Sequence, residues 1–169
     1  MIRRPWVRAL GVLGLAALLQ ATWIPMGIPD PGRPNLVFLV VAAAAFLAPL
    51  EEGLGWALAG GIWLDLFSGG PMGLSALALM AAVPLAHGLS RPVFRGRLIM
   101  PALVAAGGTL LMEGVRGFLL MALQYPVDWN TVFQRIVLPE ALWNTIGMLL
   151  LYPLLRALRP RPERPALRG

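Results

Sequence analysis

The sequence predicts an all-α, polytopic membrane protein with six transmembrane helices. Hydrophobic residues make up 58% of the 169 residues and charged residues only 13%, whereas about a quarter of a soluble domain is charged. Long apolar stretches alternate with short breaks rich in Gly, Pro or charge, which is typical of successive membrane spans. The alternating apolar and polar segments of a transmembrane β-barrel are missing from the sequence. Because the bilayer core offers no water to backbone groups, helices remain as the spanning structure.

The first predicted helix covers residues 9–26, an uncharged stretch that follows Arg3, Arg4 and Arg8. A basic start and an apolar run are also typical of a secretory signal peptide. The apolar run is long, and no small-x-small cleavage site precedes the next turn, which favours an uncleaved helix. Residues 25–34 hold four prolines and two glycines and are predicted to be a loop.

The second predicted helix starts after Pro34 and covers residues 35–50. Glu51 and Glu52 are predicted to form a tight turn, and as acidic residues they suit the positive end of the next helix dipole. The third helix covers residues 53–67. The sequence Ser-Gly-Gly-Pro at residues 68–71 then breaks the chain before a fourth helix over residues 72–90, with a kink at Pro84.

A basic loop separates the fourth helix from the fifth, which covers residues 98–123. Residues 125–130 form a polar turn, and the sixth helix covers residues 132–155. We therefore expect a six-helix transmembrane domain over residues 1–157, followed by a basic, disordered cytoplasmic tail over residues 158–169. The basic loop between the fourth and fifth helices carries Arg91, Arg95 and Arg97.

The arginines are unevenly distributed between the two sides of this arrangement. All 14 basic residues are Arg; the N-terminus, the basic loop and the tail hold three, three and five of them, which makes 11 of the 14. Basic residues favour the cytoplasmic side of bacterial membranes. The distribution therefore predicts an inner-membrane protein with both termini in the cytoplasm, and with the loops at Asp30, Gly69 and Asp128 outside.

Catalytic and metal-binding patterns are missing from the sequence. It has no Cys, no phosphate-binding glycine loop, no HExxH and no GxSxG. We therefore predict neither an enzyme nor a bound cofactor or metal. The single His87 is interpreted as an interfacial side chain, and a histidine switch is the alternative. The net charge of +6 is assigned to orientation and to anionic membrane lipid rather than to nucleic acid.

Polar residues inside the apolar helices are the candidate functional residues, because such residues are costly in a membrane. At 1.5 Å per residue from Leu98, Glu113 and Arg116 lie about 22 and 27 Å above the cytoplasmic edge. Glu140 and Asn144 share a face of the sixth helix, in the same outer half as Asp65. Two interpretations remain open: hydrogen bonds that join helices three, five and six, or a polar pocket that opens outward for a ligand or a partner's helix.

Small residues recur every four positions on the third predicted helix. Gly53, Ala57 and Gly61 precede Asp65 on one helix face. Such a stripe allows two helices to approach closely. We expect it to offer a packing surface to a transmembrane helix of a partner protein.

Residues 63–74, with the sequence WLDLFSGGPMGL, resemble the signature of the MreD family of rod shape-determining proteins. The short six-helix layout, the Pro-Asn-Leu-Val that begins at Pro34 and the basic tail resemble this family as well. By this resemblance Asp65 either anchors the turn or contacts a partner. Gly69 and Gly70 would let the backbone reverse, Pro71 would start helix four, and Gly73 would permit close approach.

The resemblance implies a non-enzymatic component of the rod, or elongation, complex that supports peptidoglycan synthesis and rod shape. MreC is the implied direct partner, and RodA, a class B penicillin-binding protein and MreB are implied members of the complex. The family is also similar in fold to the substrate-binding subunits of energy-coupling-factor vitamin transporters, which is the alternative function. Those subunits carry an Ala-x-x-x-Ala pattern on helix one. Ala17 and Ala21 fit this pattern too weakly to decide.

Overall fold

The computed structural model describes residues 5–27, 32–90 and 99–158. All regular structure in these ranges is helical, without strands. The elements are α1 (Pro5–Thr22), α2 (Ile24–Gly27), α3 (Leu36–Leu47), α4 (Leu50–Ser68), α5 (Leu74–Gly88), α6 (Ile99–Ala122), α7 (Trp129–Val132), the π-helical segment η2 (Phe133–Val137) and α8 (Leu138–Leu158). The elements α7, η2 and α8 follow one another without a break.

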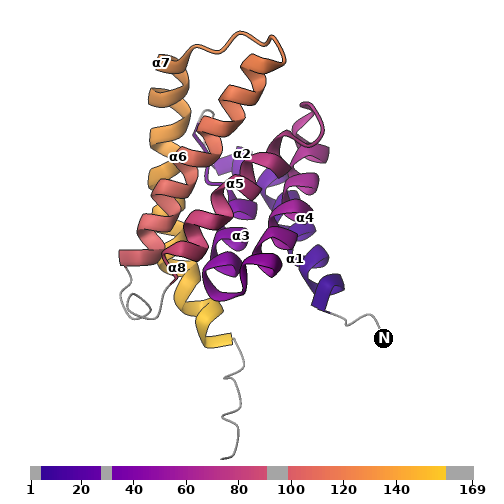
Figure 1. Cartoon of the computed structure of the whole chain (residues 1–169), viewed down its shortest axis with the longest axis vertical. Helices are drawn as coiled ribbons and strands as arrows, with labels where there is room; N and C mark the ends of the chain where they lie inside the picture. The colour runs from indigo at the N-terminus through magenta and orange to yellow at the C-terminus, as the bar shows by residue number, and fades with distance from the viewer. Residues whose placement is uncertain (1–4, 28–31, 91–98, 159–169) are drawn as a thin grey trace, which may run out of the picture.

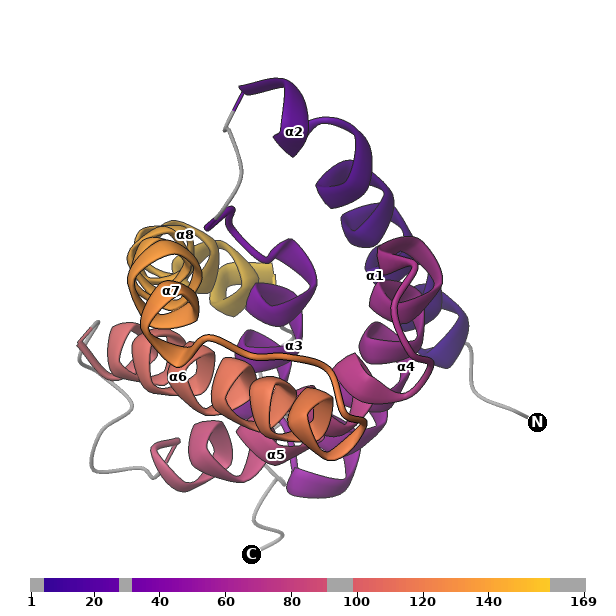
Figure 2. The ribbon, with the colours of Figure 1, turned by 90° about the horizontal axis from the view of Figure 1, so that it is seen from above.

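Helix α3 lies at the centre of the bundle and contacts α1, α4, α5, α6 and α8 (Figures 1 and 2). Its sequence, LVFLVVAAAAFL, is apolar on every side, and such a helix is stable only where every side is covered. Phe38 and Phe46 are almost completely buried. The ring of Phe46 packs edge-on against Tyr152 of α8, with 5.3 Å between the ring centroids.

The small-residue stripe of α4 packs inside the chain. A Cβ atom built on Gly61 would lie 2.1 Å from the Cα atom of Ala76 in α5. One built on Gly53 would lie 3.1 Å from both Ala45 of α3 and Val83 of α5. The stripe does allow close helix packing, but the chain's own α3 and α5 occupy it. The prediction that it offers a surface to a partner's helix is therefore wrong.

Several predicted boundaries also differ from the structure. Pro25 lies within the short helix α2 rather than in a loop, because proline is tolerated in the first turn of a helix. The turn between α3 and α4 is formed at Ala48 and Pro49, so Glu51 and Glu52 lie in the first turn of α4. There they meet the positive end of the helix dipole, as their charge favours.

The last helical stretch begins earlier than predicted. Asp128 caps α7, and its carboxylate accepts hydrogen bonds from the Thr131 hydroxyl and the backbone N–H of Asn130. These hydrogen bonds lower the pKa of the exposed Asp128 carboxyl, the Thr131 bond most strongly. The π-helical segment η2 was not predicted, because such segments are rare and occur mostly as single turns inside α-helices.

Three helical stretches in the described ranges are long and apolar enough to cross a membrane: Ala9–Gly27, Ile99–Ala122 and Trp129–Leu154. The apolar helices α3 and α5 are shorter, and α4 carries three acidic residues. Large apolar side chains are exposed on α1, α6 and α8. Such a surface is unfavourable in water and suits lipid, so the chain is a membrane protein.

Some of the predictions concern residues outside the described ranges. These are the two arginines at positions 3 and 4, the loop at Asp30, the basic loop with Arg91, Arg95 and Arg97, and the tail from residue 159 onward.

Candidate functional site

Asp65 holds the turn between α4 and α5. Its Oδ2 atom accepts a hydrogen bond of 2.7 Å from the backbone N–H of Gly73, and Oδ1 accepts one of 2.9 Å from the N–H of Ser75. The helical spacing of α4 brings Asp65 onto the buried face, where it is 3% exposed. One carboxylate therefore satisfies two N–H groups at the start of α5, which have no partner within the helix. A second role in contacting a partner remains a prediction.

The glycines of the turn differ in what they contribute. Gly69 ends α4 with φ of 65° and Gly73 precedes α5 with φ of 90°, a conformation that costs other residues a Cβ clash. A Cβ on Gly73 would meet no atom within 4 Å, so its backbone conformation, rather than close approach, requires glycine. Gly70 does not have a positive φ. Pro71 lies before α5, which begins at Leu74, so it does not start the helix.

A buried hydrogen-bond network joins α3, α6 and α8 around Asn144. The Oδ1 atom of Asn144 accepts a hydrogen bond of 2.8 Å from the backbone N–H of Asn35, the residue that caps α3. Its Nδ2 group donates to the Thr109 hydroxyl of α6 at 2.9 Å and to Glu140 at 3.4 Å. Asn144 and Thr109 are fully buried. The amide thus satisfies polar groups of three helices that would otherwise be desolvated without partners.

Glu113 and Arg116 lie one turn apart on α6. Arg116 Nη1 lies 3.7 Å from Glu113 Oε1, an oxygen that is buried and has no hydrogen-bond partner among the described residues. The Glu113 side chain is 6% exposed and that of Arg116 40%. The arginine therefore reaches from a buried acid toward an open space.

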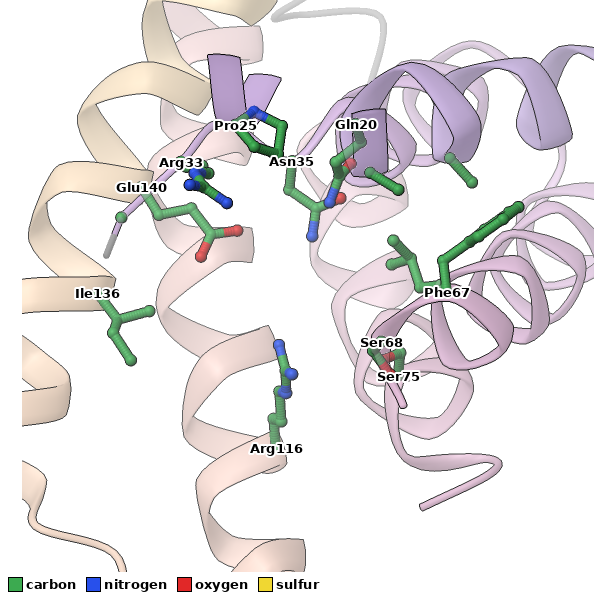
Figure 3. A pocket seen from close by; sticks show the side chains of 14 residues that line it. Gln20, Pro25, Arg33, Asn35, Phe67, Ser68, Ser75, Arg116, Ile136 and Glu140 are labelled. Carbon is green, nitrogen blue, oxygen red and sulfur yellow. The ribbon is translucent and has the colours of Figure 1, made fainter. Parts of the chain in front are cut away.

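That space is a polar pocket of about 520 Å³. Figure 3 shows the Arg116 and Glu140 side chains reaching into it from α6 and α8, opposite residues of α1 and α4. Its lining residues are Ala17, Gln20, Ala21, Pro25, Gly32, Arg33, Asn35, Leu64, Phe67, Ser68, Ser75, Arg116, Ile136 and Glu140. We call it the α6–α8 pocket. It lies at the end of the bundle where α1 and α4 end and α3 and α5 begin.

A comparison with the sequence models of protein families shows the family of this chain. The sequence model of the family described as rod shape-determining protein MreD matches residues 2–160. The chain belongs to the MreD family. No curated protein and no solved structure matches it.

Membership in the MreD family makes this a rod shape-determining membrane protein, of a family known for a structural role rather than catalysis. It also places the protein in the context of the rod-shape complex in general. Within the described residues, no group of three or more His, Asp or Glu residues is arranged to hold a metal.

The structure of this MreD-family protein places the predicted site residues in three groups. Glu140 and Asn144 share the buried network, whereas Glu113 and Arg116 form their own pair on α6. Asp65 belongs to the α4–α5 turn, although its partner Ser75 lines the pocket together with Arg116. The polar residues of α6 and α8 thus join helices and also line a pocket.

Sequence reasoning missed three polar residues next to these groups. Thr109 is the partner of Asn144, and Gln20 accepts a hydrogen bond from the N–H of Val37 at the start of α3. Asn35 caps α3 by accepting a hydrogen bond from Phe38. An Asn directly after a proline and before an apolar run is a helix-start signal, so Asn35 was open to prediction from the sequence. Gln20 and Thr109 carry no comparable signal.

Proposed function

We propose that this protein acts by binding, as a non-enzymatic inner-membrane component of the rod complex, and that MreC is its direct partner. RodA, a class B penicillin-binding protein and MreB complete the proposed complex, which supports peptidoglycan synthesis and rod shape. The observation that carries the proposal is the family match over residues 2–160. The sequence also lacks a nucleophile-and-base pair of known pattern, which leaves the chemistry to the partners.

The proposal includes a topology of six membrane spans with both termini in the cytoplasm. The arginine distribution supports it. So does the arrangement of the bundle, in which α1 begins and α8 ends at the same lower end in Figure 1. The α4–α5 turn and the α6–α7 connection then face the outside.

We further propose that the outer surface of the α4–α5 turn contacts MreC. Asp65 fixes the shape of this turn from inside, and Phe67 and Met72 present apolar surface beside it, 45% and 66% exposed. A rigid turn with exposed apolar side chains is a suitable contact for a partner, because little conformational entropy is lost on binding.

Copurification of MreC from native membranes tests this proposal. Met72→Glu should lower the recovery of MreC about tenfold, because the charge would be desolvated in the interface. Tyr125→Glu is the matched control, since Tyr125 is 53% exposed on the α6–α7 connection. Depletion of the protein in a rod-shaped host should also give widened or round cells.

Two results would contradict this function: rods of normal shape after depletion, and no recovery of MreC with the wild-type protein. The alternative of a vitamin-binding transporter subunit has no finding in its favour. Mass spectrometry of the purified protein would detect a bound vitamin directly.

A further inference from the structure

The α6–α8 pocket lies where short helices end beside long ones. Helices α3 and α5 have 12 and 15 residues and are about 18 and 22 Å long at 1.5 Å per residue. The hydrocarbon core of a bilayer is about 30 Å thick. Helix α6 has 24 residues, about 36 Å, and continues beyond the ends of its short neighbours (Figure 1). The recess that results lies close to the boundary between acyl chains and lipid headgroups.

The pocket contains a cationic group, the Arg116 guanidinium, with N–H donors available to a ligand. Within the described residues, the Arg116 guanidinium forms an ion pair with Glu113, with 3.7 Å between Nη1 and Oε1. This distance exceeds the roughly 2.7–2.9 Å of a charge-assisted hydrogen bond. A guanidinium carries five N–H donors. Arg116 lies about 26 Å along α6 from Ile99, a depth suited to a lipid phosphate.

The pocket also contains a buried acid. Glu140 is 6% exposed, and its carboxylate points into the same space as Arg116 (Figure 3). The hydrogen bond that it accepts from Asn144 is long at 3.4 Å. A carboxylate in such a place is stabilised by a donor of positive charge.

A second arginine, Arg33, also lines the pocket, and the other lining groups are uncharged. Gln20, Asn35, Ser68 and Ser75 supply amides and hydroxyls, and Leu64, Phe67 and Ile136 supply apolar surface. The volume of about 520 Å³ falls within the range of about 300–1,000 Å³ for small-ligand pockets.

We propose that the α6–α8 pocket binds the headgroup of a zwitterionic phospholipid of the phosphoethanolamine type, with the phosphate at Arg116 and the primary ammonium at Glu140. A purely anionic headgroup would place negative charge near Glu140, and a simple cation would be repelled by Arg116 and by Arg33, the second arginine of the lining. A primary ammonium donates three hydrogen bonds, whereas a choline group donates none. This inference does not depend on the contact with MreC.

Native mass spectrometry of the full chain, released from nanodiscs with equal amounts of three lipids of matched acyl chains, tests the proposal. The lipids are phosphatidylethanolamine, phosphatidylcholine and phosphatidylglycerol. The wild-type protein should retain phosphatidylethanolamine about tenfold more than the other two. Glu140→Gln should remove this preference but keep phospholipid binding, and Arg116→Gln should lower the retention of all three.

Glu51→Gln and Arg135→Gln are the matched controls, because both side chains are exposed and neither lines the pocket. Stepwise N-methylation of the headgroup gives a test that needs no variant, and each methyl group should weaken binding to the wild-type protein. Equal retention of all three lipids by the wild-type protein would refute the proposal. So would a preference that Glu140→Gln leaves unchanged.

Soluble phosphoethanolamine distinguishes the two sources of this headgroup. If the lipid binds more tightly than the solute, the ligand is a membrane lipid as proposed. Tighter binding of the solute would assign the pocket to a water-soluble ligand and overturn the proposal.

Discussion

Asp65 accepts hydrogen bonds from two backbone N–H groups of the turn that follows its helix, so its replacement has graded consequences. Asp65→Asn keeps one acceptor oxygen and should leave one N–H without a partner, at a cost of about 1–3 kcal/mol. Asp65→Leu removes both acceptors and should cost about twice as much. Thermal unfolding in detergent measures the order Asp, Asn, Leu, and cell shape in a depleted host should follow it. Equal stability of the three proteins would show that the turn does not depend on this carboxylate.

Asn144 gives a second test at the scale of single residues. Asn144→Leu keeps a similar volume but leaves the N–H of Asn35 and the hydroxyl of Thr109 without this partner. We expect a loss of about 1–3 kcal/mol in the free energy of unfolding. Thr145→Val is the control on the same helix, because the Thr145 hydroxyl donates only to the backbone of its own helix at Ala141. If both variants unfold at the same temperature, the interhelical network does not stabilise the fold.

At the scale of elements, the packing of α4 against α5 depends on a glycine. Gly61→Ala would place a Cβ atom 2.1 Å from the Cα atom of Ala76, and a backbone atom cannot yield without separating the two helices. Overpacking of this kind costs about 1–3 kcal/mol, so the melting temperature in detergent should fall. Gly11→Ala is the matched control, since a Cβ atom there would meet nothing within 4 Å. A helical Gly-to-Ala change in open space should raise stability slightly.

Sequence periodicity and breaks predicted most helices because each apolar run ends at a residue that a helix excludes. Gly69 and Gly73 mark such ends in the structure, whereas the break at Pro49 was missed. The stripe at Gly61 was recognised as a packing surface, but a sequence pattern does not say whether the partner is a neighbouring helix or another protein. The partners of Asn144 could not be read from the sequence either, because Asn35 and Thr109 lie 109 and 35 residues away from it along the chain.

At the scale of the whole molecule, the six-span topology with both termini in the cytoplasm remains to be tested. The chain contains no Cys, so single cysteines can be introduced without background labelling. Asp128 is exposed at the cap of α7, and Asp128→Cys should react with a membrane-impermeant maleimide in intact spheroplasts.

Arg95→Cys lies in the basic loop and should react only after the membrane is opened, because basic loops stay on the cytoplasmic side. Each variant thus controls for the other. Detergent permeabilisation should make both cysteines reactive, which would exclude burial as the reason why a position is not labelled in intact cells. Labelling of position 95 but not of position 128 in intact cells would reverse the orientation. It would place the α4–α5 turn in the cytoplasm, together with the mouth of the α6–α8 pocket. Labelling of both positions in intact cells would place both loops outside and contradict the six-span topology, in which the single fifth helix separates them.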